Sequence, residues 1–146
     1  MIGLVQRVAE ASVVVNGHTV GAIGSGLLVL VCAEPADTPV QASKFGDKVL
    51  KLRIFSDDAG KMNRSVQDVQ GGLLVVSQFT LAADTSGGNR PSYTGAASPD
   101  LGRALYDEVL RVARERHAPV AAGIFGADMR VQLVNDGLVM IPLRIA

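Results

Sequence analysis

The chain has 146 residues, of which 48% are apolar and 19% are charged, and this composition excludes a disordered protein. Its length is that of one domain, so we expect a single domain over residues 1–146. The formal net charge is zero, which excludes a protein that grips nucleic acid through many phosphates and predicts at most a local contact.

Short strands dominate the first part of the chain. The expected strands are Ile2–Arg7, Ala11–Val15, His18–Ile23 and Leu27–Ala33. The dipeptide Asn16-Gly17 between apolar runs is a strong signal for a β-hairpin. Cys32, the only cysteine, falls in the last of these strands and is expected to be a buried core thiol rather than a nucleophile.

Two helices are predicted by a capping residue followed by proline. Thr38-Pro39, with Gln41 completing a capping box, begins the first helix, and Ser98-Pro99 begins the second. Between them the run Leu73–Val76 reads as a strand that ends at Ser77. The expected final strands are Val120–Phe125, Met129–Val134 and Val139–Ile145.

This order of elements predicts a mixed α/β domain with a mostly antiparallel or barrel-like sheet and two main helices. The βαβαβ alternation of a doubly wound sheet is not visible. No apolar run approaches 18 residues and no basic leader precedes an apolar stretch, so neither a membrane span nor a signal peptide is expected. A lone cysteine cannot form an internal disulfide, which favours the reducing cytoplasm.

The residues that could carry chemistry are few. Ser77, Thr80 and Cys32 are candidate nucleophiles, but neither His18 nor His117 stands in a motif that would orient it as a base. No metal-binding spacing or nucleotide fingerprint is present, so neither a metal nor a cofactor is expected. What remains is the strand end itself.

Backbone N–H groups at that strand end could stabilise a developing oxyanion. We expect the amides of Gln78 and Phe79 to be free where the strand Leu73–Val76 runs out. The alternative from the residues alone is that Ser77–Leu81 is only a strand with one aromatic side chain in the core.

Several motifs resemble those of the bacterial D-aminoacyl-tRNA deacylase family, and the similarity covers nearly the whole chain. The stretches that carry it are Ile2–Val8, Gly24–Leu30, Leu52–Phe55, Gly60–Asn63, Ser77–Leu81, Arg90–Ser92, Gly126–Met129 and Asn135–Gly137. The resemblance implies an enzyme that cleaves the ester between a D-amino acid and the 3′-terminal adenosine of tRNA. It also implies removal of glycine from mischarged tRNA-Ala, a homodimer, and no metal or cofactor.

The resemblance also implies roles for individual residues. Ser77, Gln78 and Phe79 would line the pocket, with the Gln78 and Phe79 amides as the oxyanion hole, while the terminal 2′-hydroxyl of the tRNA assists. Thr80, a catalytic candidate, would support the pocket instead of attacking the ester. Phe125 and Met129 would flank the terminal adenosine, and Gly102 would leave space for it. Arg7 would hold the Gly137 segment of the partner chain.

The family's second motif, Gly-Pro-Val-Thr with a cis proline, reaches into the partner's pocket and excludes L-amino acids. Here the segment is Gly137-Leu138-Val139-Met140. A cis bond before a residue other than proline costs about 3–4 kcal/mol, against about 0.5–1 before proline. The Gly137–Leu138 bond is therefore predicted to be trans, with L-substrates cleaved measurably.

Two functions remain open. The intact Ser77–Thr80 segment favours a tRNA-ester hydrolase that binds the 3′ end of aminoacyl-tRNA. Leu138 and Met140 favour a descendant that is non-catalytic or altered in selectivity and binds charged tRNA or D-amino acids. In either case we expect weak contact with tRNA phosphates, for which Arg103, Arg111 and Arg114 on the second helix are the candidates.

Overall fold

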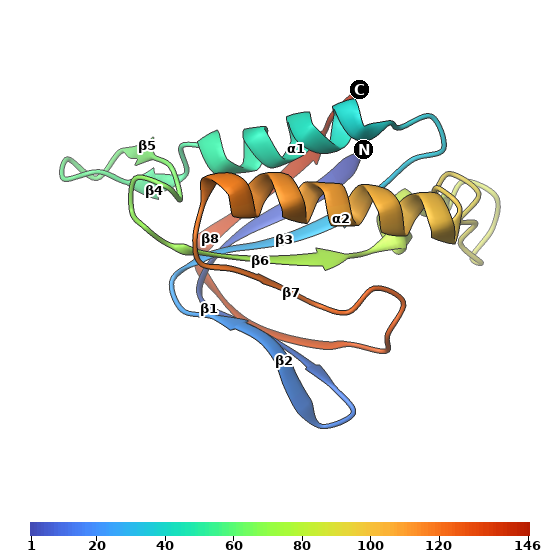
Figure 1. Cartoon of the computed structure of the whole chain (residues 1–146), viewed down its shortest axis with the longest axis horizontal. Coiled ribbons are helices and arrows are strands. Elements are labelled where there is room, and N and C mark those ends of the chain that lie inside the picture. The colour runs from blue at the N-terminus through green and yellow to red at the C-terminus, as the bar shows by residue number, and fades with distance from the viewer.

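A six-stranded sheet with two helices forms the body of the structure, a computed structural model that describes residues 1–146. This arrangement, shown in Figure 1, confirms the predicted mixed α/β class. The elements are β1 (Ile2–Val15), β2 (His18–Ile23), β3 (Gly26–Cys32), α1 (Pro39–Lys51), β4 (Phe55–Ser56), β5 (Met62–Arg64), β6 (Gly72–Ser77), η1 (Phe79–Ala82), α2 (Pro99–Arg116), β7 (Val120–Ala122) and β8 (Arg130–Arg144). Neither helix has the length and apolar character needed to cross a membrane.

The sheet combines antiparallel and parallel pairing. Strand β1 is antiparallel to β2, β3 and β8, whereas β3, β6 and β7 are parallel to one another. The chain from β3 through α1, β6 and α2 to β7 is therefore a βαβαβ unit. The prediction that this alternation is absent was wrong. Both helices cover the same face of the sheet (Figure 1), so the sheet is not doubly wound. The alternation is hard to recognise in the sequence because the small hairpin β4–β5 interrupts it and β7 has only three residues.

Two long strands replace four predicted short ones. The segments Ile2–Arg7 and Ala11–Val15 belong to one strand of 14 residues, β1. Likewise the two segments expected after Phe125 form one strand of 15 residues, β8, which pairs along β1 from Ile2 to Val14. The register shifts between Gln6 and Val8 and between Val8 and Glu10, and residues 136–139 of β8 bulge out of the ladder at the first of these shifts.

The sheet curls until β2 approaches β7. A Cβ atom on Gly21 of β2 would lie only 2.5 Å from the carbonyl oxygen of Ala122 in β7, so only glycine permits this approach. Alternate residues of β3 and β6 then face two apolar clusters. Leu27 and Leu73 contribute to the cluster beneath the helices, while Leu28 and Leu74 contribute to the one inside the curl. Burial on both faces explains the uninterrupted apolar runs.

Local sequence signals set the turns and helix starts. Asn16 and Gly17 have φ values of 50° and 78°, as a two-residue hairpin requires, and β2 follows directly. The Thr38 hydroxyl accepts the Val40 N–H at 3.2 Å and Gln41 completes the capping box, so α1 begins as predicted. The Ser98 hydroxyl caps α2 by accepting the Leu101 N–H at 3.3 Å. These predictions are confirmed.

The α-ammonium group of Met1 is buried and links both ends of the chain to the loop after β3. It lies 3.0 Å from Glu34 Oε1 and 2.9 Å from Asp37 Oδ2, and it donates to the Ile145 carbonyl at 2.7 Å. Desolvation opposes ionisation of Glu34, but hydrogen bonds from this ammonium and from Arg144 outweigh it and lower the Glu34 pKa. The ionised carboxylate therefore stabilises the folded state.

Replacement of Glu34 by glutamine is expected to lower the free energy of unfolding at pH 7 by about 1.5–3 kcal/mol, the usual contribution of a hydrogen bond to a charged group. The pKa of Glu34 is lower in the folded state than in the unfolded chain. Its contribution to the free energy of unfolding is therefore complete above the ordinary glutamate pKa, and it is lost as the pH falls through the folded-state pKa. Urea unfolding of wild type and Glu34→Gln between pH 3 and 7 measures this. The exposed Glu115→Gln is the control, and equal pH dependence in all three proteins would contradict the assignment.

Candidate active site

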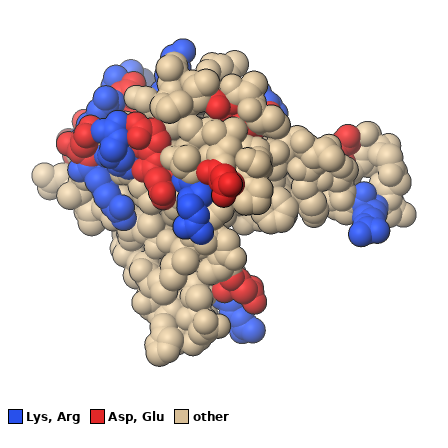
Figure 2. All heavy atoms as spheres, turned by 45° about the vertical axis from the view of Figure 1, so that its right-hand side comes forward, with Lys and Arg blue, Asp and Glu red and all other residues tan.

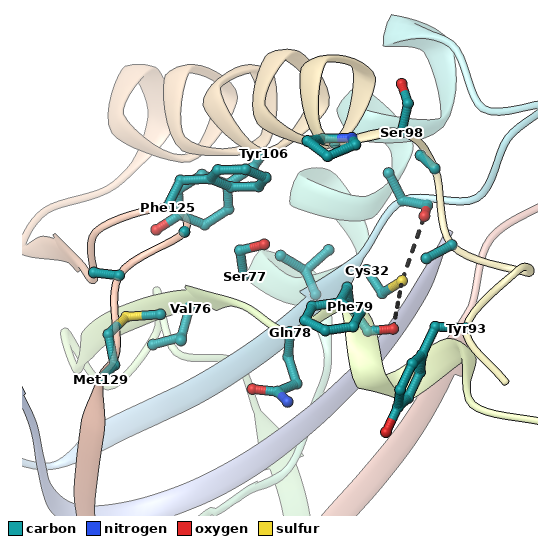
Figure 3. Close-up of a pocket in the computed structure, with 18 of the residues that line it drawn as sticks. Cys32, Val76, Ser77, Gln78, Phe79, Tyr93, Ser98, Tyr106, Phe125 and Met129 are labelled. Atoms are coloured by element: carbon teal, nitrogen blue, oxygen red, sulfur yellow. Dashed lines mark hydrogen bonds between the residues drawn. The ribbon is translucent and has the colours of Figure 1, made fainter. Parts of the chain in front are cut away.

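A cavity of about 590 Å³ opens where the ends of β3 and β6 meet the start of α2. It is mainly apolar, and most of its lining is drawn in Figure 3. Six of the predicted site residues line it, namely Ser77, Gln78, Phe79, Gly102, Phe125 and Met129. The structure therefore brings together residues from β6, α2 and the β7–β8 connection, which lie far apart in the sequence.

The backbone amides that follow β6 differ in their hydrogen bonding. Strand β6 stops at Ser77, and a 3₁₀ turn begins at Phe79. The Gln78 N–H donates to the Val31 carbonyl of β3 at 2.8 Å. This corrects the expectation that both amides are free, because Gln78 continues the ladder for one more residue. The first N–H groups of a helical turn have no acceptor within it, so the Phe79 amide, unlike that of Gln78, has no partner within η1.

Two contacts hold Phe79, and a third joins the residues on either side of it. Its ring, which is 57% exposed, meets the Tyr93 ring edge to face at a centroid distance of 5.1 Å. Its carbonyl lies 3.6 Å from Cys32 Sγ. The Gln78 side-chain amide donates to the Thr80 hydroxyl across the turn. Thr80 does not line the cavity, and its position agrees with a supporting role.

No hydrogen bond joins a nucleophile candidate to a histidine or carboxylate side chain. Cys32 lines the cavity but is buried, and desolvation, followed by the charge of Glu34, raises the pKa of its thiol. His117 contacts the Gly71 carbonyl at 2.7 Å just past the last residue of α2, and His18 follows the β1–β2 turn. Neither histidine lines the cavity.

Alanine at Cys32 or at Thr80 is therefore expected to leave substantial turnover of a bound ester. Loss of a true nucleophile lowers kcat by a factor on the order of 10⁶. Single-turnover rates of Cys32→Ala and Thr80→Ala, each checked for folding by thermal unfolding, measure the effect. A covalent acyl-enzyme trapped on Ser77, Cys32 or Thr80 would overturn this expectation.

The opposite wall is aromatic and close-packed. The ring centroids of Phe125 and Tyr106 are 6.0 Å apart. A Cβ atom on Gly102 would lie 3.5 Å from the Phe125 ring, in van der Waals contact, so a side chain larger than that of alanine at 102 would narrow the cavity. The Tyr106 hydroxyl donates to the Val75 carbonyl at 2.7 Å, and burial raises its pKa to about 12. Tyr106 is therefore a structural hydrogen-bond donor and not an acid at neutral pH.

The segment Gly137–Met140 lies away from this cavity, in β8. Asn135 braces it, since its side chain accepts the Val139 N–H at 3.1 Å and donates to the Val139 carbonyl at 3.3 Å. The Gly137–Leu138 bond is trans, because the one cis bond of the chain is Ala118–Pro119. Leu138 is 80% exposed at the tip of the segment.

Arg7 contacts this segment within its own chain. It donates to the Asp136 carbonyl at 3.2 Å and to the Ile54 carbonyl at 2.8 Å, and its ion pair with the Asp136 carboxylate is 3.5 Å long. Arg7 thus links its own β8 to the residue before β4. A contact between Arg7 and the segment of a partner chain stays a prediction.

The three arginines proposed for phosphate contact differ in their surroundings. Arg111 is held between Glu108 and Glu115, whose hydrogen bonds and charges raise its pKa and occupy its donors. Both carboxylates would compete with a phosphate for the same donors, so Arg111 is the weakest of the three candidates. Figure 2 shows acidic and basic side chains intermingled on one side of the molecule, with only scattered charges on the two projecting arms.

Sequence reasoning missed Tyr93, Tyr106 and Asp128 as lining residues. Tyr106 could have been found, because it lies three residues before Val109 and so on the buried face of α2. Tyr93 and Asp128 lie in connections, and no local pattern indicates that these return to the end of β6. Their placement depends on the long-range packing of the sheet.

Comparison with known proteins agrees with this geometry. The family model described as D-Tyr-tRNA(Tyr) deacylase matches residues 4–144. A protein of Polaromonas naphthalenivorans strain CJ2 named D-aminoacyl-tRNA deacylase is 68% identical over 100% of this chain and 98% of its own. A protein of the same name from Variovorax paradoxus strain S110 is 66% identical over 100% of both chains.

Two solved structures have the same architecture. One, named c-Myc DNA Unwinding Element Binding Protein, is 38% identical with a TM-score of 0.94 and covers 100% of this chain and 99% of that chain. The other is titled as the structural analysis of a probable eukaryotic D-amino acid tRNA deacylase. It is 17% identical with a TM-score of 0.82 over 97% of each chain, which shows a shared fold.

Proposed function

Because the chain belongs to the D-Tyr-tRNA(Tyr) deacylase family, we propose that it hydrolyses the ester bond of D-aminoacyl-tRNA and releases the free D-amino acid and tRNA. The observation that carries this proposal is the Phe79 amide at the start of η1, beside a cavity of about 590 Å³. Glycine attached to tRNA-Ala, which has no side chain to exclude, is the second substrate that we propose. With this role in translation quality control we propose that the protein acts in the cytoplasm.

The proposed mechanism relies on positioning and on one backbone donor. Hydrolysis of an ester builds negative charge on the carbonyl oxygen, and a preorganised N–H group stabilises that charge. The Phe79 amide supplies it, and the Cys32 and Tyr93 contacts hold the amide in place. The 2′-hydroxyl of the terminal ribose assists the attacking water. A side-chain base is then unnecessary, which is consistent with the positions of His18 and His117 outside the cavity.

We also propose a homodimer that buries β8. This strand pairs only with β1, so its outer edge carries unpaired backbone groups that a folded protein normally covers. Four of its apolar side chains are exposed, namely Leu133, Val134, Leu138 and Met140. Through this edge the Gly137 segment of one chain would complete the cavity of the other.

Lysine at Leu133 is expected to give a monomer that has lost most of its activity. The matched control is Val20→Lys on β2, because Val20 and Leu133 are almost equally exposed, at 38% and 37%. Sedimentation velocity should show twice the mass of one chain for wild type and for Val20→Lys, and a single mass for Leu133→Lys. A fully active monomer would refute the proposed role of the partner.

A second candidate is a binding protein with altered or lost catalysis. Leu138 and Met140, which stand where the family has proline and threonine, are the observation that favours it. The two candidates separate in one assay, since a binding protein would slow the spontaneous deacylation of D-tyrosyl-tRNA or leave it unchanged. An enzyme would accelerate it at substoichiometric concentration.

A further inference from the structure

Arg103 occupies a distinctive place at the rim of the cavity. It follows Gly102, a lining residue of α2, and its guanidinium carbon lies 4.9 Å from the centroid of the Phe125 ring. Phe125 itself lines the cavity, across from Phe79 in Figure 3. Whereas Arg111 is neutralised by Glu108 and Glu115, Arg103 is exposed and has no ion-pair partner in the chain.

Stacking on an aromatic ring prepares an arginine to bind an oxyanion. The planar guanidinium keeps its face on the ring while its N–H donors point outward along the edge. Those donors match two oxygens of a phosphate in a bidentate arrangement, and less rotamer freedom is lost because the plane is already fixed. Arg103 thus combines a free charge, a fixed plane and a position beside the cavity.

The other cations of α2 are too far away or already paired. Arg114 lies 11 positions further along the helix, which is about 16 Å at the rise of an α-helix. Arg116 pairs with Asp47 at 3.0 Å. On the rim, Asp128 lines the cavity and Asp100 lies in the first turn of α2, and both would repel a phosphate. Arg103 is the residue that can offset them.

We propose that Arg103 binds the phosphate that joins the terminal nucleotide of charged tRNA to the preceding one. This inference rests on the proposed function and adds a specificity determinant to it. The ester enters the cavity beside the Phe79 amide, and the nucleoside lies toward Phe125. Arg103 then contacts the first phosphodiester outside and makes the enzyme prefer a tRNA ester over an ester of adenosine alone.

The test compares two substrates and four proteins. D-Tyrosyl-tRNA carries the phosphate, whereas 2′(3′)-O-D-tyrosyl-adenosine does not. Wild type, Arg103→Gln, Arg103→Lys and the control Arg111→Gln are assayed from 50 to 300 mM KCl. Arg103→Gln should raise KM for D-tyrosyl-tRNA about tenfold with kcat unchanged. It should also reduce the slope of log(kcat/KM) against log[salt] by about one, the contribution of one phosphate contact.

The other two variants test whether the effect depends on the charge at position 103. Arg103→Lys should keep the salt slope of wild type, because it keeps the charge, and Arg111→Gln should match wild type on both substrates. Neither Arg103 variant should change hydrolysis of the adenosine ester. An unchanged salt slope in Arg103→Gln, or an equal loss on both substrates, would overturn the assignment and leave hydrolysis itself intact. Wild type without activity on D-tyrosyl-tRNA would instead refute the proposed function.

Discussion

Proline at position 79 is expected to lower kcat for D-aminoacyl-tRNA about 10²–10³-fold below that of alanine at the same position, the usual cost of removing one oxyanion donor. Both substitutions remove the aromatic ring, but only proline removes the N–H group. The difference between Phe79→Pro and Phe79→Ala therefore isolates the amide, and single-turnover deacylation of D-tyrosyl-tRNA measures it.

The backbone at this position accepts proline. Residue 79 is the first of the turn η1, where proline is favoured because that N–H has no helical acceptor. Gln78, which precedes it, has φ −144° and ψ 85° and so lies outside the α region that a following proline disfavours. Equal thermal stability of the two variants would confirm that the fold is kept. Equal rates in the two variants would show that the Phe79 amide does not stabilise the transition state.

Proline at position 138 is expected to raise the preference for D- over L-aminoacyl-tRNA by about 10–100-fold. The difference in cis cost between Gly–Pro and Gly–Leu is roughly 2–3 kcal/mol, and in the family the carbonyls of a cis Gly-Pro bond exclude L-amino acids. In this chain the bond is trans and Leu138 is exposed at the tip of its segment. Wild type should therefore cleave L-tyrosyl-tRNA measurably, and Leu138→Pro should cleave it less.

Leu138→Ala is the matched control for that experiment. It shortens the side chain but leaves a residue that disfavours the cis bond, so its D/L ratio should stay near that of wild type. The Asn135 and Arg7 contacts that brace the segment remain in both variants. A D/L ratio that is the same in Leu138→Pro as in wild type, or a dimer structure with a cis Gly137–Leu138 bond, would contradict this explanation of selectivity.

Local signals predicted those parts of the fold that depend on neighbouring residues. The Asn16-Gly17 hairpin and the Thr38 capping box are formed within a few residues, and both are present as predicted. The continuity of β8 could not be predicted in this way, because the polar segment around Asp136 is held by Arg7, between stretches of β8 that pair with β1. The same holds for β7, whose three residues form a strand only beside β6.

In the site too, the residues that line the cavity could be predicted from the sequence, whereas their hydrogen bonds to distant residues could not. The resemblance placed Ser77, Phe125 and Met129 around one pocket, and all three line the cavity. The state of the Gln78 amide depends on the Val31 carbonyl of another strand, so no pattern around residue 78 could reveal that it is already bonded. Whether the donors of Arg111 are occupied similarly depends on which rotamers bring Glu108 and Glu115 to it.

Deacylation of D-tyrosyl-tRNA in the presence of EDTA tests the central claim most directly. Catalysis by the Phe79 amide and the substrate's own hydroxyl requires no metal, and the chain brings together no group of three or more His, Cys, Asp or Glu side chains that could hold one. The account predicts that catalytic amounts of the protein release D-tyrosine in EDTA far faster than spontaneous hydrolysis does. Release at the spontaneous rate, or activity that EDTA abolishes and zinc restores, would contradict it.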